Sequence, residues 1–402
     1  MRSKRLQTSI CLLFSISALF LSASIVLAKE EILVDVDSDA GLNTAQIIQA
    51  RGYEVELHKI TTADGYVLTM HRIPKSYDET QSGSAAAANK PVVVLQHGLL
   101  DSSYTWVLNY RDQSLAFILA DLGYDVWLGN NRGTTWSKEH KEYSTDDERF
   151  WDFTWEDMGK YDLPAMIKGA LSVSGRSTLS YVGHSEGTTQ AFVGFTHDQE
   201  LAKSVSYFGA LTPVAWTGDA TSPIFVTLAK TYMDTWLQAF GGKEFLPNNP
   251  LLQNLLGSTV CAWADETPAG TSAKNVGHYA QGIRDNTFAS YDYGCNCDPS
   301  AGIDACSEFD CGNKAKYGSF QPPAFPIQKM VYPRTGFYSG ARDTLATQAD
   351  INKLRAGLPR GTIVFDKTVD FGHIDFTWAY NAHENVYNDL IQQIQQYEGK
   401  GY

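Results

Sequence analysis

The residues around Ser185 have the pattern of a serine nucleophile. Residues 183–187 read Gly-His-Ser-Glu-Gly, the six residues before them are typical of a short strand, and residues 188–195 are typical of a helix. A nucleophile elbow requires this context, because its serine sits in a sharp, strained turn between a strand and a helix. Gly183 and Gly187 leave out side chains that would collide with backbone in such a turn. The alternative is a Gly-Ser turn of an ordinary α/β protein.

A serine hydroxyl needs a base, and the base needs an acid that orients it. Asp343 and His373 each follow one of the last two predicted strands, and the chain order serine, acid, histidine is that of an α/β-hydrolase triad. Asp350 is the alternative acid, but it falls within a predicted helix. His383 lies ten residues after His373 in a helical run and should be remote. We therefore predict that Ser185, Asp343 and His373 act together.

The negative charge that develops on the substrate needs two backbone N–H donors. The residue after the nucleophile, Glu186, supplies one, and Leu99, in the His-Gly-Leu loop after a buried strand, is predicted to supply the other. His97 could itself be catalytic, but we favour a role in bracing this loop. The sequence has no Gly-rich phosphate loop and no His-x-x-x-His pair, so we expect no metal and no cofactor.

Strands alternate with helices through most of the chain. Asp64-Gly65 lies between two runs and predicts a hairpin. The spacing of the other elements predicts an α/β fold with a mainly parallel central sheet wrapped by helices. The predicted strands are 54–62, 66–74, 91–96, 124–128, 177–182, 205–211, 330–339 and 362–369, and the predicted helices include 104–122, 155–173 and 348–358.

The alternation stops between residues 214 and 326. This 214–326 segment has helical stretches, turns and a cysteine-rich loop, so we predict that it is an insertion, called the cap below, in a core made of residues 29–213 and 327–402. Most of its aromatic residues should pack the cap on the core. We expect a subset to line an acyl tunnel and a movable lid, and the candidates are Trp216, Phe225, Trp236, Phe240 and Phe245.

Residues 1–28 have a basic start, an apolar stretch and a small-residue site at Ala28, which predicts a secretory signal peptide. A retained signal anchor is the alternative. Cleavage would remove three cations and take the formal net charge from −13 to −16. A chain this acidic is a poor partner for nucleic acid or anionic membranes. No later stretch is apolar enough to span a membrane, so we expect a secreted protein, with the lysosome or vacuole as alternatives.

Five cysteines follow the predicted signal peptide. In an oxidising compartment four can pair, and the cluster Cys295, Cys297, Cys306 and Cys311 is predicted to form two local disulfides of unspecified connectivity. Cys261 is then the free thiol. The cluster contains no histidine at metal-ligand spacing, which argues against zinc.

Taken together, these motifs resemble the acid lipase family, which includes gastric and lysosomal lipases. The resemblance covers about residues 47–395 and rests on stretches spread along the chain: 52–53, 61–66, 97–103, 130–133, 136–137, 150–153, 160–165, 183–188, 268–272 and 373–376. It implies the triad and oxyanion-hole roles given above and a cap over 214–326. The activity it implies is hydrolysis of lipid carboxylic esters, most of all triacylglycerol, at a lipid–water interface.

Three features depart from the family pattern. The residue after the nucleophile is usually Gln but is Glu186 here, and a carboxylate there is expected to lower activity as pH rises by opposing the oxyanion. The cysteine-rich stretch is an apparent insertion, and the chain has no Asn-x-Ser/Thr sequon, which favours secretion over glycan-directed lysosomal sorting. The alternatives are a steryl ester hydrolase, a short-chain esterase, a serine peptidase on the same fold, and a catalytically silent lipid-binding protein.

Overall fold

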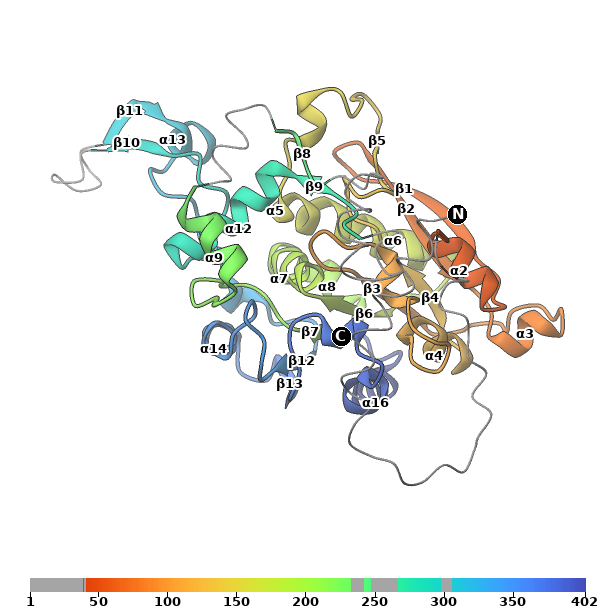
Figure 1. Ribbon diagram of the computed structural model, residues 1–402. Helices are drawn as coiled ribbons and strands as arrows, with labels where there is room; N and C mark the ends of the chain where they lie inside the picture. The colour runs from red at the N-terminus through yellow and green to blue at the C-terminus, as the bar shows by residue number, and fades with distance from the viewer. Residues whose placement is uncertain (1–38, 40, 233–241, 247–266, 298–305) are drawn as a thin grey trace, which may run out of the picture.

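A central sheet positions the site in this computed structural model, which describes residues 39, 41–232, 242–246, 267–297 and 306–402 (Figure 1). The strands, in their order across the sheet, are β1 (Glu56–Thr61), β2 (Tyr66–Ile73), β4 (Asp125–Leu128), β3 (Val92–Gln96), β6 (Leu179–His184), β7 (Val205–Leu211), β12 (Thr335–Gly340) and β13 (Ile363–Val369), with the short β5 (Glu139–His140) on β2.

The sheet is antiparallel at one end and parallel elsewhere. β1 and β2 form the predicted hairpin, β2 pairs antiparallel with β4, and every pair from β4 to β13 is parallel. In the centre, Val94 lies opposite Trp127 on one side and Tyr181 on the other. The mainly parallel sheet is therefore confirmed. Parallel strands end at the same edge, where catalytic loops of such sheets gather.

Helices cover both faces of the sheet, and successive residues of β3 alternate between the two cores. Val92 and Val94 face the core beneath α5 (Trp155–Asp157), α6 (Leu163–Ser174), α7 (Glu186–His197) and α14 (Gln348–Gly357). Val93 and Leu95 face the core beneath α2 (Thr44–Ala50), α4 (Leu115–Asp121) and α16 (Asn388–Tyr397). Burial on both faces explains why residues 92–95 of β3 are a continuous apolar run.

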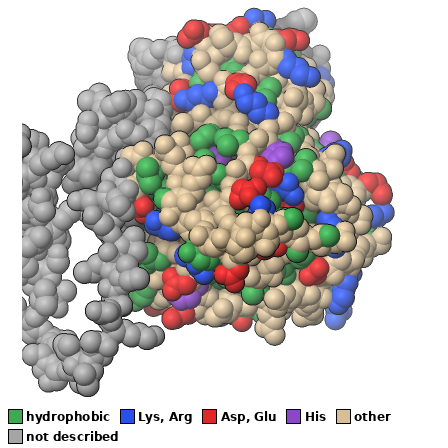
Figure 2. Space-filling model, turned by 90° about the vertical axis from the view of Figure 1, so that its right-hand side faces the viewer, with side chains coloured by type: hydrophobic (Ala, Val, Ile, Leu, Met, Phe, Trp, Pro, Cys, Tyr) green, Lys and Arg blue, Asp and Glu red, His purple; other side chains and the backbone are tan. Residues whose placement is uncertain are grey.

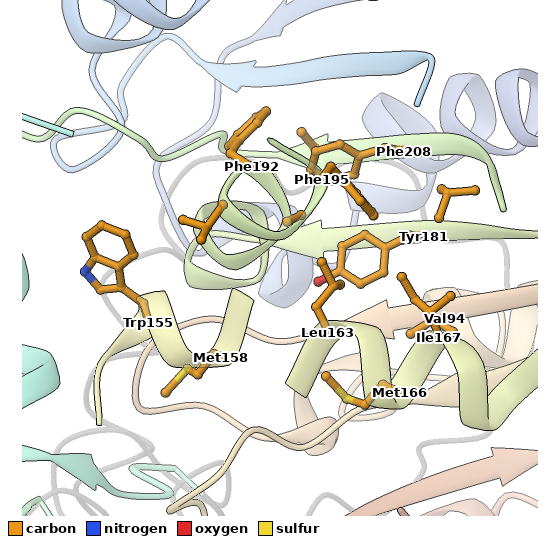
Figure 3. Packing of buried hydrophobic residues seen from close by; sticks show 14 of the residues in the cluster. Val94, Trp155, Met158, Leu163, Met166, Ile167, Tyr181, Phe192, Phe195 and Phe208 are labelled. Carbon is orange, nitrogen blue, oxygen red and sulfur yellow. The ribbon is translucent and has the colours of Figure 1, made fainter. Parts of the chain in front are cut away.

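The core beneath α6 and α7 is rich in aromatic residues (Figure 3). Phe192 and Phe195 of α7 pack against Phe208 of β7, with ring centroids 5.4 and 5.6 Å apart. Tyr181 of β6 lies 5.6 Å from the same ring. This packing holds α7 firmly on the strand that precedes Ser185.

Some predicted elements are shorter than the sequence indicated. The predicted helix 104–122 is wrong in its first half: a 3-10 helix, η2 (Ser103–Trp106), is followed by turns, and α4 begins only at Leu115. The intervening residues include Asn, Asp and Ser, whose side chains compete with helix formation, and the Ser114 hydroxyl donates to the Asn109 carbonyl (2.9 Å). β12 begins at Thr335, after Pro333, which has no N–H for the ladder.

The helical run predicted from near Phe376 is also interrupted. It consists of α15 (Asp375–Trp378), the π-helical turn η8 (His383–Tyr387) and α16. A π-helical turn, η4 (Met158–Asp162), likewise joins α5 to α6. The remaining short elements are α3 (Tyr77–Gln81), η3 (Glu148–Trp151), α8 (Gln199–Lys203) and η7 (Ile327–Lys329).

The described parts of the 214–326 segment lie outside the central sheet, beside α5 and α7 at the upper left of Figure 1. Its elements are α9 (Pro223–Lys230), β8 (Glu244–Phe245), β9 (Thr271–Ser272), α12 (Ala273–Asp285), β10 (Cys295–Cys297), β11 (Cys306–Cys311) and α13 (Gly312–Tyr317). Its limits as a cap domain stay a prediction, and the lid candidates Trp236 and Phe240 fall outside the described residues. Residues 1–28, the predicted signal peptide, also fall outside them.

One disulfide joins the two strands of the cysteine-rich hairpin. Cys295 of β10 is bonded to Cys311 of β11. The same ladder places the backbone of Cys297 opposite that of Cys306, and the second disulfide stays a prediction. Cys261, the predicted free thiol, is outside the described residues.

The face that carries β1 and α3 is solvated. Figure 2 shows acidic and basic side chains mixed over this face, with hydrophobic ones in small groups. Side-chain burial alternates along β1, and the exposed Lys59 ammonium pairs with Glu139 (2.6 Å). None of the helices in the described ranges has the length and apolar character needed to span a bilayer.

Candidate active site

Ser185 occupies the turn between β6 and α7, as the elbow pattern predicts. Its φ is 52°, a left-handed value that is uncommon for a residue with a side chain. A Cβ added at Gly183 would lie 2.5 Å from the Gly187 carbonyl oxygen, and one added at Gly187 would lie 2.5 Å from the carbonyl oxygen of Gln96. The two glycines therefore let three backbone segments meet around the strained serine.

We predict that Gly183→Ala lowers both stability and activity. The new methyl group would press on the backbone of Gly187, and such overpacking costs about 1–3 kcal/mol. The shift should also move the Ser185 hydroxyl away from His373. We therefore expect a lower kcat and unfolding at a lower denaturant concentration. Gly401→Ala is the control, because its added Cβ meets only Thr178 at 3.5 Å. Equal stability and kcat in the two variants would contradict the elbow geometry.

The structure brings the three predicted triad residues into one hydrogen-bonded chain. The Nε2 atom of His373 lies 2.7 Å from the Ser185 hydroxyl, and its Nδ1 lies 2.8 Å from Oδ2 of Asp343. The other oxygen of Asp343 accepts from the N–H groups of Leu345 and Ala346 (2.8 and 2.9 Å). The fully occupied carboxylate favours a proton on Nδ1, so that Nε2 is free to accept from the serine.

The alternative residues lie elsewhere and have other partners. Asp350 is buried in α14, where it accepts from the N–H of Asp219 (2.9 Å) and pairs with Lys353 (2.7 Å). The Nδ1 of His383 donates to the carbonyl of Tyr380 (2.9 Å). Of the acid and base candidates, the geometry therefore favours Asp343 and His373.

Two further histidines brace the site. His97 donates from Nδ1 to the Gly98 carbonyl (2.8 Å) and accepts at Nε2 from the N–H of Asn131 (3.1 Å), which agrees with the predicted bracing role. His184 donates from Nε2 to the carbonyl of His373 (2.9 Å). Burial lowers the pKa of His97 to about 4 and that of His184 to about 3, so both rings stay neutral.

The sequence patterns did not predict the contact made by His184. It joins the backbone of His373 to the residue just before Ser185, across 189 positions of the chain. The signal available was the histidine inside the Gly-x-Ser-x-Gly motif. A motif does not show which distant loop its side chains will reach.

The predicted oxyanion donors flank Ser185. Leu99 lies on the loop after β3, and a Cβ added at its neighbour Gly98 would lie only 3.0 Å from that of Ser185. Glu186 opens α7, so its N–H has no acceptor within the helix. Leu99 and Glu186 thus lie on either side of Ser185, and their role as oxyanion donors stays a prediction. The N-terminus of α7 would add a favourable dipole to such a site.

A largely apolar cavity of about 260 Å³ opens on Ser185 and His373. Residues of the core and of the 214–326 segment share its wall, which includes Leu99, Val214, Ala220, Phe225, Tyr279, Ile283, Leu345, Ile374 and Trp378. Phe225 is thus the one residue of the five predicted lining and lid candidates found in the described wall. Such a cavity can bury an apolar chain next to the nucleophile.

Comparison with known proteins agrees with this arrangement. Residues 44–110 match the partial alpha/beta-hydrolase lipase region, and residues 91–376 match the alpha/beta hydrolase fold. Human lysosomal acid lipase/cholesteryl ester hydrolase is 35% identical over 91% of this chain and 94% of its own. Human gastric triacylglycerol lipase is 35% identical over 88% and 91%, and mouse lipase member K is 36% identical over 89% and 92%.

Solved structures add support for the fold alone. DcsB in complex with its substrate analogue has a TM-score of 0.51 at 10% identity, and the match covers 86% of this chain and all of that one. The matches to the human lysosomal and gastric lipases span 91% and 88% of this chain at 35% identity. Proteins that share only a fold need not be this similar in sequence. This chain therefore belongs to the acid lipase family of α/β-hydrolases and is a serine carboxylic-ester hydrolase of the acid lipase type.

Proposed function

We propose that this protein hydrolyses triacylglycerol at a lipid–water interface through an acyl-enzyme on Ser185. The observation that carries the proposal is the hydrogen-bonded chain from Asp343 through His373 to Ser185 at an apolar cavity. A polar reacting group beside an apolar wall suits an ester of a long acyl chain.

In the first half of the reaction, the Ser185 oxygen attacks the ester carbonyl while His373 Nε2 accepts its proton. Asp343 stabilises the resulting imidazolium through Nδ1. The carbonyl oxygen becomes an oxyanion, which accepts hydrogen bonds from the N–H groups of Leu99 and Glu186. His373 then protonates the alcohol oxygen, the C–O bond breaks, and the alcohol leaves.

In the second half, water replaces the alcohol. His373 accepts a proton from the water as its oxygen attacks the acyl-serine carbonyl, and the same N–H groups hold the second oxyanion. Its collapse breaks the bond to Ser185, which regains the proton from His373, and the fatty acid is released. No group besides these residues is required for either half.

We favour triacylglycerol over a steryl ester because the two substrates differ in their alcohol part. A cavity of about 260 Å³ beside Ser185 suits a slender, flexible acyl chain. The glycerol part of a triacylglycerol is flexible and can stay at the lipid surface, whereas a sterol is rigid and needs a wall of matching shape. Steryl ester is the second candidate, because one human relative is named a lysosomal acid lipase/cholesteryl ester hydrolase.

Rates on a panel of substrates test this proposal. We expect emulsified triolein to be hydrolysed with a higher kcat/KM than cholesteryl oleate or a short p-nitrophenyl ester, and a peptide amide to be left intact. A preference for cholesteryl oleate would make the protein a steryl ester hydrolase, and activity on the soluble ester alone would make it an esterase. Treatment with a serine-directed phosphonate should abolish every rate.

We further propose that the protein is secreted. The predicted signal peptide over residues 1–28 supports this, and the lack of an Asn-x-Ser/Thr sequon gives no site for a glycan-based lysosomal signal. The lysosome and vacuole are the alternatives, since the relatives include a lysosomal enzyme as well as a gastric one.

A further inference from the structure

The side chain of Glu186 turns away from the substrate cavity. The residue is 2% exposed and is absent from the cavity wall that includes its neighbour Ser185. Its Oε1 accepts a hydrogen bond from Nδ2 of Asn275 in α12 (2.6 Å), and the hydroxyl of Tyr279 also interacts with it. The residue that we predict to supply an oxyanion N–H is thus tied by its side chain to the 214–326 segment.

The orientation of the Asn275 amide is fixed by its other contacts. Its Oδ1 accepts from the backbone N–H of Trp155 (2.6 Å), so the NH₂ group must face the other way. That group donates to Glu186 and to the hydroxyl of Thr271 (3.1 Å). The site therefore calls for an acceptor on residue 186, which either a carboxyl or an amide can supply.

The contact with Glu186 lies on the same face of α12 as the cavity wall. Asn275, Tyr279 and Ile283 are spaced four residues apart, which aligns them along one side of a helix. Tyr279 and Ile283 line the cavity. A hydrogen bond from Asn275 to Glu186 consequently holds this wall in a fixed position relative to the N-terminus of α7.

Burial raises the pKa of Glu186 to about 7, partly opposed by its hydrogen bonds with Asn275 and Tyr279. Among the described residues, Glu186 has no salt-bridge partner. Asp162 of η4, which pairs with Arg132, adds to the increase in the pKa of Glu186. The other charged groups on α5 and η4 are Glu156, Asp157 and Lys160, of which Glu156 and Lys160 pair with each other. The remaining elements packed against α7 carry Lys168 of α6 and Lys329 of η7, which are exposed, and the pair Glu200 and Lys203 of α8.

We propose that Glu186 is a positioning residue whose neutral side chain holds the oxyanion donor against α12, and that its ionisation impairs the site. An ionised Glu186 would be a buried charge without a counter-ion, at the very residue whose N–H must stabilise a negative oxyanion. Activity should therefore decline as Glu186 loses its proton.

The pH dependence of Glu186→Gln tests this proposal, which rests on the proposed ester hydrolysis. Gln keeps the acceptor for Asn275 but cannot ionise. The ratio of the variant's kcat to that of the wild type should rise about tenfold between pH 6 and pH 8, as the neutral fraction of a group with a pKa near 7 falls. Glu200→Gln is the control, since this exposed residue of α8 pairs only with Lys203, and its ratio should stay flat.

Thermal unfolding gives a readout that does not depend on activity. The pKa of Glu186 is higher in the folded protein than the ordinary 4.5, so the folded form binds more protons between these values. The contribution of protonated Glu186 to the free energy of unfolding is therefore fully present below about pH 4.5 and is lost as pH rises to about 7. The melting temperature of Glu186→Gln minus that of the wild type should therefore rise as pH increases over this range. This result does not require the wild type to have lipase activity.

A second variant guards against a folding defect in the first. Asn275→Ala removes a donor that stabilises the ionised carboxyl, so the fall in kcat should move to higher pH. A purely structural defect would lower kcat by one factor at every pH. Parallel kcat profiles for wild type and Glu186→Gln, or an unmoved fall in Asn275→Ala, would overturn the proposal.

Discussion

Replacing Ser185 with alanine should lower kcat for ester hydrolysis by about 10⁶, to the limit of detection. The change removes the only oxygen within reach of His373 Nε2 in the described structure, at 2.7 Å, and leaves the base without a nucleophile to activate. In serine hydrolases, loss of the nucleophile costs about as much as loss of the whole triad.

The fold should survive this change. Ser185 makes its backbone contacts through its N–H to Leu211 and its carbonyl to Thr188, and alanine keeps both. Circular dichroism and thermal melting should match the wild type. Ser180→Ala, five residues earlier on β6, is the control. The Ser180 hydroxyl lies 3.5 Å from the hydroxyl of Ser206 in β7, so its loss should change kcat little. If Ser185→Ala kept more than about a hundredth of the activity, Ser185 would not be the nucleophile.

The central sheet could be read from the sequence because its strands are buried on both faces. Residues 92–95 are a continuous apolar run, and residues 205–211 are apolar apart from Ser206. The observed strands β3 and β7 coincide with these two stretches almost residue for residue. The chain order of Ser185, Asp343 and His373 was equally informative. Each follows a strand, and parallel strands bring their ends to one edge whatever lies between them.

Elements set by tertiary contacts could not be read in this way. Residues 103–114 contain apolar residues at helical spacing, yet Tyr104, Trp106 and Val107 are buried as a 3-10 turn and loop against the sheet rather than as one face of a helix. The direction of the Glu186 side chain was likewise inaccessible. It depends on Asn275, whose amide is oriented by the backbone of Trp155, 120 residues away.

The acid of the triad gives the second large effect. Asp343→Asn should lower kcat by about 10⁴ while leaving the backbone of the loop in place. The amide oxygen can keep the hydrogen bonds from the N–H groups of Leu345 and Ala346, which then turns the NH₂ group toward His373. Nδ1 must become an acceptor, so the proton moves to Nε2. In that tautomer His373 cannot accept the proton of Ser185.

Asp350→Asn is the matched control for this prediction, because both residues are buried aspartates after β12. Its carboxylate pairs with Lys353 and accepts from the N–H of Asp219, so the substitution should lower the melting temperature. The kcat per folded molecule should stay within about threefold of the wild type, since no contact links Asp350 to His373 in the described structure. Steady-state kinetics on active-site-titrated protein separates the two effects. A larger loss of kcat in Asp350→Asn than in Asp343→Asn would show that the orienting acid is not Asp343, because only the acid bonded to Nδ1 can select the tautomer that accepts the serine proton.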